Sequence, residues 1–178
     1  MPGVILYGPP ASGKDTVTRH LVALDRRYVP YRRIKVGPGR TAGYRMMSSE
    51  EVAALYARSE IVYENHRYGS SYFVDRSELA KQLDEAIPVL HLGQREGVDA
   101  ARRAFPAERW LVVSLWCSRE VAAERIAARD TGDIADRLAA WDGTEPVTAD
   151  LSIDTGNTSP DESARKIDQA LQDRPRKP

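Results

Sequence analysis

The chain has 178 residues, of which 26 are Lys or Arg and 26 are Asp or Glu, so its formal net charge at pH 7 is zero. This balance excludes the bulk positive field that holds nucleic acid or anionic membranes, and the length suits a single globular domain. One cysteine, Cys117, excludes an internal disulfide, and its place after an apolar run indicates a buried thiol in a cytoplasmic protein. No run of about 18 apolar residues occurs, so we expect no membrane partner.

Short apolar runs alternate with helical patterns through most of the chain, which is typical of a parallel sheet with helices on both faces. The predicted core strands are residues 4–7, 88–92, 111–116 and 151–153. The predicted core helices are residues 15–24, 98–105, 118–129 and 160–171. The last helix has the clearest start, with Ser159 as N-cap and Pro160 in its first turn. The pattern predicts a three-layer α/β fold with a parallel central sheet.

Two segments interrupt this alternation. Between residues 29 and 84 the pattern predicts a small mixed α/β insertion, with shorter strands at 28–36, 61–66 and 68–74 around a helix at 49–58. A polar turn at residues 130–133 lies between arginines and predicts a short lid. The resulting division is a core of residues 1–28, 85–124 and 141–172, a mobile insertion of residues 29–84, a lid of residues 125–140 and a disordered tail of residues 173–178.

A phosphate-binding loop is the strongest motif. Gly8-x-x-x-x-Gly13-Lys14 follows a predicted strand and opens a predicted helix. Glycine lets the backbone curl around a phosphate, so that N–H groups and the helix N-terminus point inward while Lys14 reaches the outer phosphates. The loop therefore predicts a phosphotransferase that binds MgATP, rather than a glycine-rich connection with a surface lysine. The expected nucleotide contacts are Gly8, Ala11, Ser12, Gly13, Lys14, Asp15 and Thr16, with Lys14 also catalytic.

Asp15 occupies the position where many such loops carry the Ser or Thr whose hydroxyl meets magnesium. Either Asp15 contacts the magnesium shell through water, or it lies in the first helical turn, where negative charge is stabilised. A carboxylate beside a triphosphate would repel it, so we expect Thr16 to make the polar contact with phosphate. Both residues remain candidates for the magnesium ligand.

Three arginines flank the predicted lid. Arg125 and Arg129 lie one helical turn apart, and Arg137 follows the polar turn. Phosphoryl transfer needs positioning and cations that offset the charge of the migrating group, so the three guanidinium groups are predicted to act in catalysis. The alternative is a solvated helix face with charge pairs along it. Asp133 and Asp136 are expected to neutralise these arginines rather than to act in catalysis.

The chain resembles guanylate kinases and the related ribose 1,5-bisphosphate phosphokinases over nearly its whole length. The loop with Asp15 after Lys14 is similar to that of the second group, and residues 89–95 resemble that group's strand ending in Gly-x-Arg, here Gly93-Gln94-Arg95. The resemblance implies an ATP-dependent kinase with a small phosphorylated acceptor, which Arg95 helps to bind. It also implies that the lid arginines close over the phosphates, and that Asn157, after the last core strand, lies beside the adenine.

In guanylate kinases two arginines and two tyrosines hold the acceptor phosphate. The resemblance puts Arg32, Lys35, Tyr44 and Tyr68 on these positions, and Arg33 or Arg40 is expected to contribute because a lysine cannot form a bidentate fork. The positions that read guanine hold Tyr28 and Val62, which favours an acceptor with another base or none, and the alternative is that a two-residue gap brings Glu64 into the guanine-reading role. The alternatives are a solvated basic strand edge and tyrosines that only pack.

A nucleoside monophosphate is the leading acceptor from the sequence, and a sugar phosphate such as ribose 1,5-bisphosphate is the close alternative. A second alternative is a non-catalytic binding module of the guanylate kinase type, against which Lys14 and the lid arginines count. His91, near the end of a core strand, is either a ligand contact or a satisfied core histidine. A monomer or homodimer without a nucleic acid partner is expected.

Overall fold

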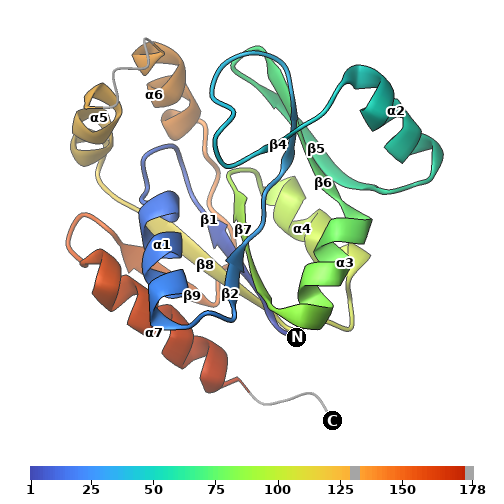
Figure 1. Cartoon of the computed structure of the whole chain (residues 1–178). Coiled ribbons are helices and arrows are strands. Elements are labelled where there is room, and N and C mark those ends of the chain that lie inside the picture. The colour runs from blue at the N-terminus through green and yellow to red at the C-terminus, as the bar shows by residue number, and fades with distance from the viewer. Residues whose placement is uncertain (129–132, 175–178) are drawn as a thin grey trace.

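The computed structural model describes residues 1–128 and 133–174. Its main element is a five-stranded, wholly parallel sheet in the order β2-β7-β1-β8-β9 (Figure 1). These strands are β1 (Gly3–Tyr7), β2 (Tyr28–Pro30), β7 (Ile87–Leu92), β8 (Trp110–Trp116) and β9 (Leu151–Asp154). Every residue of β1 is buried, as expected for a central strand covered on both faces.

Helices cover both faces of this sheet (Figure 1). Val4 and Leu6 of β1 pack with α1 (Lys14–Leu24) and α7 (Pro160–Gln172). Ile5 and Tyr7, which point the other way, pack with α3 (Arg76–Glu85) and α4 (Arg95–Ala104). The alternation of one strand therefore builds two cores, and the predicted three-layer α/β fold is confirmed.

A second sheet of four strands has the order β4-β3-β6-β5. Its strands are β3 (Ile34–Val36), β4 (Arg45–Met46), β5 (Ile61–Arg67) and β6 (Ser70–Asp75). Ile34 and Phe73 pack with Val52 of α2 (Ser49–Ala57), which covers the outer face of the sheet. Ser48 and Glu51 form a capping box at the start of α2.

Two short helices complete the fold: α5 (Arg119–Ala127) and α6 (Ile134–Asp142). They pack together through Ile126 and Leu138, close to the buried Cys117. Arg129 and most of the predicted polar turn lie outside the described residues. Among the described helices, none has the length and apolar character needed to cross a membrane.

Three expectations from the sequence need correction. The predicted strand 28–36 is two strands, because Tyr28 is buried in the central sheet with its hydroxyl on Asp168, whereas β3 belongs to the second sheet. Helix α3 was not predicted at all. Part of the tail expected to be disordered is ordered, since Asp173 ends α7 and Arg174 forms an ion pair with Asp150.

Candidate active site

The loop between β1 and α1 curls tightly at its first glycine. Gly8 has φ +154°, and a Cβ atom there would lie 2.1 Å from the carbonyl oxygen of Leu115. Ala11 and Gly13 also have positive φ, at 62° and 90°. These left-handed positions turn the backbone back on itself before the helix begins.

The N-terminus of α1 has no side-chain cap, unlike those of α2, α5 and α7, each of which a serine caps. Uncapped first-turn N–H groups and the positive end of the helix dipole form a ready anion site. The Lys14 ammonium lies over the same loop and donates to the carbonyl oxygens of Gly8 and Pro9, both at 2.7 Å. The predicted phosphate-binding loop thus has the geometry of a polyphosphate-binding site.

A cleft of about 420 Å³ opens from this loop towards the second sheet and α6. Its polar lining consists of Ser12, Lys14, Asp15, Arg33, Lys35, Arg40, Tyr44, Asn65, Arg67, Tyr68, Tyr72, His91, Gln94, Asp133, Asp136 and Arg137. The residues come from both sheets, from α1 and from α6. Six of them are cations, so the cleft is suited to several phosphate groups although the whole chain is neutral.

Asp15 is held at the edge of the loop by His91. The Nδ1 atom of His91 lies 3.4 Å from the carboxylate, and its Nε2 atom lies 2.7 Å from the Thr18 hydroxyl. Burial lowers the pKa of His91, and the hydrogen bond from His91 holds the pKa of Asp15 well below its usual range. A neutral His91 imidazole beside an ionised Asp15 carboxylate agrees with both lowered pKa values. The proton of the imidazole is assigned to Nδ1, which faces Asp15.

The residues fit a magnesium ion that arrives with the nucleotide. Among the described residues no three His, Cys, Asp or Glu side chains gather into a metal cage. Magnesium usually keeps several waters and takes only one or two protein oxygens beside substrate phosphates. Asp15 is half-exposed and lines the cleft, whereas Thr16 lines two adjoining cavities instead. The contact of Thr16 with phosphate therefore stays a prediction.

Tyr44, Tyr68, Arg33 and Lys35 of the predicted acceptor set do converge on the cleft. The Tyr44 ring lies 5.3 Å from that of Tyr72, and the Arg33 guanidinium lies 5.1 Å from the Tyr72 ring centre. Tyr68 has φ 54° in the tight turn between β5 and β6. This strained conformation aims its ring at Arg137 of α6, whose guanidinium lies 5.2 Å away.

Lys35 stabilises the loop that forms one wall of the cleft. Its side chain is buried, and its ammonium donates to the carbonyl oxygens of Pro38 and Arg40 at 2.5 and 2.9 Å. It therefore holds the loop between β3 and β4, and the neighbouring guanidinium groups of Arg33 and Arg40 reach the cleft. Arg40 also lies 3.5 Å from Asp15.

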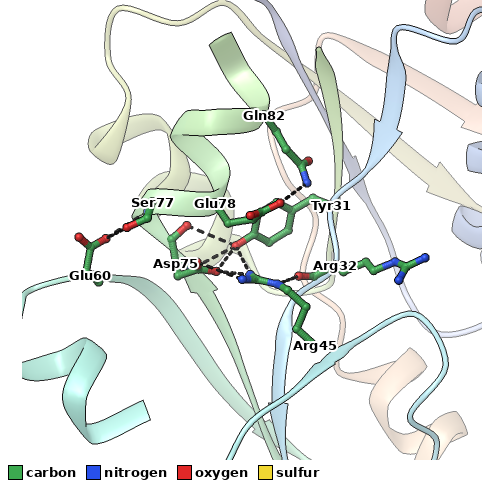
Figure 2. Close-up of polar contacts among 8 residues, drawn as sticks. All are labelled: Tyr31, Arg32, Arg45, Glu60, Asp75, Ser77, Glu78 and Gln82. Atoms are coloured by element: carbon green, nitrogen blue, oxygen red, sulfur yellow. Dashed lines mark hydrogen bonds and ion pairs between the residues drawn. The ribbon is translucent and has the colours of Figure 1, made fainter. Parts of the chain in front are cut away.

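Several predicted site residues lie elsewhere. Arg32 lines an adjoining cavity instead of the cleft, and its backbone oxygen accepts from Arg45 in the link before β3 (Figure 2). Arg95 is exposed at the start of α4, and Asn157 is exposed and donates to Asp154 at 2.6 Å. Neither lines the cleft.

The two lid arginines that the structure describes, Arg125 and Arg137, have different contacts. Arg125 donates to the backbone oxygens of Ala11 and Thr155, at 3.1 and 2.7 Å, so its guanidinium braces the outside of the loop. Arg137 lines the cleft and forms an ion pair of 2.6 Å with Asp133, in line with the predicted neutralisation. Arg129 lies outside the described residues.

Four cleft residues were missed from the sequence: Asn65, Arg67, Tyr72 and Gln94. The register of the second sheet explains three of them. Tyr72 lies opposite Lys35 on one side and opposite Asn65 on the other, and Arg67 follows Asn65 by two residues. Alternation along residues 63–67 was the signal that could have placed Asn65 and Arg67 on the face of Lys35.

The sheet order, the loop and the cationic cleft define a kinase of the P-loop class. The chloramphenicol phosphotransferase-like family model matches residues 83–172, and a ribose 1,5-bisphosphate phosphokinase (PhnN) of Methylobacterium radiotolerans is 32% identical over 177 residues, covering 94% of this chain and 96% of that protein. The chain therefore belongs to the chloramphenicol phosphotransferase-like family of P-loop kinases. It is also similar along nearly its whole length to that phosphokinase, and it is an enzyme of the kinase type.

Two guanylate kinases are more distant matches. That of Granulibacter bethesdensis is 28% identical over 144 residues, covering 77% of this chain and 68% of that protein. The crystal structure of guanylate kinase from Anaplasma phagocytophilum has a TM-score of 0.66 at 18% identity, covering 96% of this chain and 84% of that one. The second similarity supports the fold alone.

Proposed function

We propose that the protein transfers the γ-phosphate of MgATP to ribose 1,5-bisphosphate. The observation that carries this choice is the cleft-facing side of the second sheet, which offers Arg33, Arg67, tyrosines and an amide but no carboxylate among the described residues. Guanine N–H groups need acceptors such as carboxylates, whereas phosphates need cations. Tyr28 and Val62, on the positions that read guanine in guanylate kinases, pack in the central cores. The phosphokinase relative, similar along the whole chain, supports the same acceptor.

Each part of the cleft has a proposed role. The backbone of the loop and Lys14 bind the outer phosphates of ATP, and Asp15 would lie near a magnesium ion, which would supply charge compensation for those phosphates. Tyr44, Tyr68 and Arg40 orient the phosphate that attacks, and Arg137 of the α5–α6 lid offsets charge on the transferred group. Transfer is direct, from ATP to the acceptor phosphate oxygen, with no covalent enzyme intermediate.

A nucleoside monophosphate is the second candidate, favoured by the tyrosine pair Tyr44 and Tyr68. A panel assay of ATP consumption separates the candidates, with ribose 1,5-bisphosphate, ribose 5-phosphate, GMP, AMP and CMP as acceptors. We expect turnover with the bisphosphate alone and none in Lys14→Met. Turnover with a nucleotide while ribose 1,5-bisphosphate stays inert would reject the proposed acceptor, and acceptor-independent ATP hydrolysis would reject the kinase role.

A further inference from the structure

We infer that Arg33 and Arg67, set in place by Asn65 and Gln94, form a subsite for a second phosphate of the acceptor, the one that does not react. This inference rests on the proposed function, because it names the part of the same cleft that would distinguish a bisphosphorylated acceptor from a monophosphorylated one. None of Asn65, Arg67 and Gln94 was predicted from the sequence.

The subsite is built on one face of the second sheet. Arg33 and Lys35 are two residues apart at the start of β3, and Asn65 and Arg67 are two residues apart on β5, with Tyr72 between the two strands. Residues two apart on a strand point to the same side. All of them line the cleft, while the opposite face of the sheet packs on α2.

Both guanidinium groups are oriented by neutral amides. Arg33 donates to the Asn65 side-chain oxygen at 3.0 Å. The Gln94 amide satisfies its two neighbours when its oxygen faces Arg67, which then donates two bonds of 2.9 Å, and its nitrogen faces the Tyr63 hydroxyl at 3.3 Å. Gln94 immediately precedes α4, so the β7–α4 connection fixes the direction of Arg67.

Neither guanidinium is compensated by a carboxylate. In the described part of the chain, Arg27, Arg45, Arg119, Arg137 and Arg165 each form an ion pair, but Arg33 and Arg67 form none. The nearest acidic residue along β5, Glu64, is exposed and lies beside His66 instead. Arg33 and Arg67 are both partly buried on the wall of the cleft, and a dianionic phosphate would stabilise both through charge-assisted bonds.

The subsite lies on the wall of the cleft that the second sheet forms. Tyr44 and Tyr68 line the same cleft, so an acceptor whose reacting phosphate they hold could place its second phosphate against this wall. The ligand class is a sugar with phosphates at two ends.

The experiment compares Arg67→Met, which keeps the length of the side chain without its charge, with Arg67→Lys and with Arg103→Met, an exposed arginine of α4 outside the cleft. Steady-state kinetics are measured for ribose 1,5-bisphosphate and for ATP, and ribose 5-phosphate serves as an inhibitor that carries only the distal phosphate. We expect Arg67→Met to raise the KM for the bisphosphate and the Ki of ribose 5-phosphate together, by about 10- to 100-fold, with kcat and the KM for ATP within about threefold. Arg67→Lys should lie between, because a lysine keeps the charge but not the fork.

The experiment distinguishes a failure of the subsite from a failure of the proposed function. If the wild type uses the bisphosphate but Arg67→Met leaves its KM unchanged, or lowers only kcat, the distal phosphate is bound elsewhere. If the wild type fails to use the bisphosphate, the proposed function falls, and calorimetry with ribose 5-phosphate still decides the subsite: equal affinity in wild type and Arg67→Met, or no binding to either, rejects it. Arg33→Met provides a second variant, and melting temperatures show that each variant is folded.

Discussion

Gly8 is the residue on which the shape of the phosphate-binding loop depends most. A Cβ atom there would lie 2.1 Å from a backbone oxygen of β8 and 2.8 Å from the Ser12 hydroxyl, and φ is +154°. Gly69 also has a positive φ, of 68°, but a Cβ atom there would meet nothing within 4 Å. Substitution at Gly8 therefore introduces both a steric clash and backbone strain, whereas substitution at Gly69 introduces backbone strain alone.

We expect Gly8→Ala to destabilise the protein by about 3 kcal/mol or more and to abolish ATP binding, since β8 or the loop must shift. Gly69→Ala should cost only about 1 kcal/mol, the strain of a left-handed alanine. Urea denaturation and calorimetry with ATP measure both effects. Similar losses of stability for the two variants would contradict the clash at Gly8.

Adjacent residues also show where reasoning from sequence ends. The resemblance put Arg32 on an acceptor-binding position and gave Arg33 only a contributing role beside Lys35, whereas it is Arg33 that lines the cleft. The pairing of Ile34 with Phe73 fixes the apolar side of β3, and therefore puts Arg33 on the cleft side and Arg32 on the other. Such a one-residue choice depends on where β3 begins and how it pairs, which a single predicted strand over residues 28–36 does not resolve.

At the scale of elements, the two sheets are joined by a cluster around Asp75, at the end of β6 (Figure 2). Tyr31, in the link between β2 and β3, donates to Asp75 at 2.6 Å, and Arg45 of β4 forms an ion pair with the same carboxylate. Tyr31 also donates its backbone N–H to Val89 of β7 at 3.0 Å. The cluster therefore connects the central sheet to two strands of the second sheet, β4 and β6.

We expect Asp75→Asn to lower the free energy of unfolding by about 2–4 kcal/mol, since it leaves the Arg45 charge without its partner. The value lies below that of a fully buried pair because the Arg45 side chain is 28% exposed. Urea denaturation measures it, with Asp161→Asn, from an exposed pair on α7, as a control expected to change stability by less than about 1 kcal/mol.

The pH dependence of this cluster has a definite sign. Burial raises the pKa of Asp75, but hydrogen bonds from Arg45 and Tyr31 outweigh it, so the pKa of the folded state lies below the usual value. The stabilisation is present above about pH 4 and is lost as pH falls through the lower, folded pKa. The gap between wild type and Asp75→Asn should therefore shrink at low pH, and a gap that widens there would contradict this assignment.

Helix α3 was missed because its start has no local signal. Asp75 precedes it but gives its carboxylate to Arg45 and Tyr31. Glu60, which comes before β5, accepts from the backbone N–H and hydroxyl of Ser77 instead, at 3.1 and 2.6 Å (Figure 2). A cap that comes from 17 residues away is a tertiary contact. By contrast, α7 carries its own cap and was predicted from residue 160, where it begins.

At the scale of the whole molecule, the sequence predicted the layers and the loop correctly, because both depend on local periodicity and on a contiguous motif. The cleft was only half predicted. Its walls come from α1, from two sheets and from α6, and the side chains that meet there are decided by packing between distant segments. Arg125 is an example. Helical spacing predicted that it lies near the lid, but its guanidinium donates to the carbonyl oxygens of Ala11 and Thr155.

Nucleotide binding should stabilise the whole fold. A ligand that binds only the folded state stabilises it by about 2.7 kcal/mol at 100 times its Kd, which for a domain of this size raises Tm by roughly 5–10 °C. We expect this shift with magnesium and a non-hydrolysable ATP analogue, and a much smaller one when EDTA removes the metal. Lys14→Ala should lose the shift, whereas Lys81→Ala, an exposed lysine of α3, should keep it. An equal shift in both variants would mean that the nucleotide binds outside the loop. Among the described residues the cleft contains one other lysine, Lys35, and its ammonium is bound to the β3–β4 connection, so it does not replace Lys14.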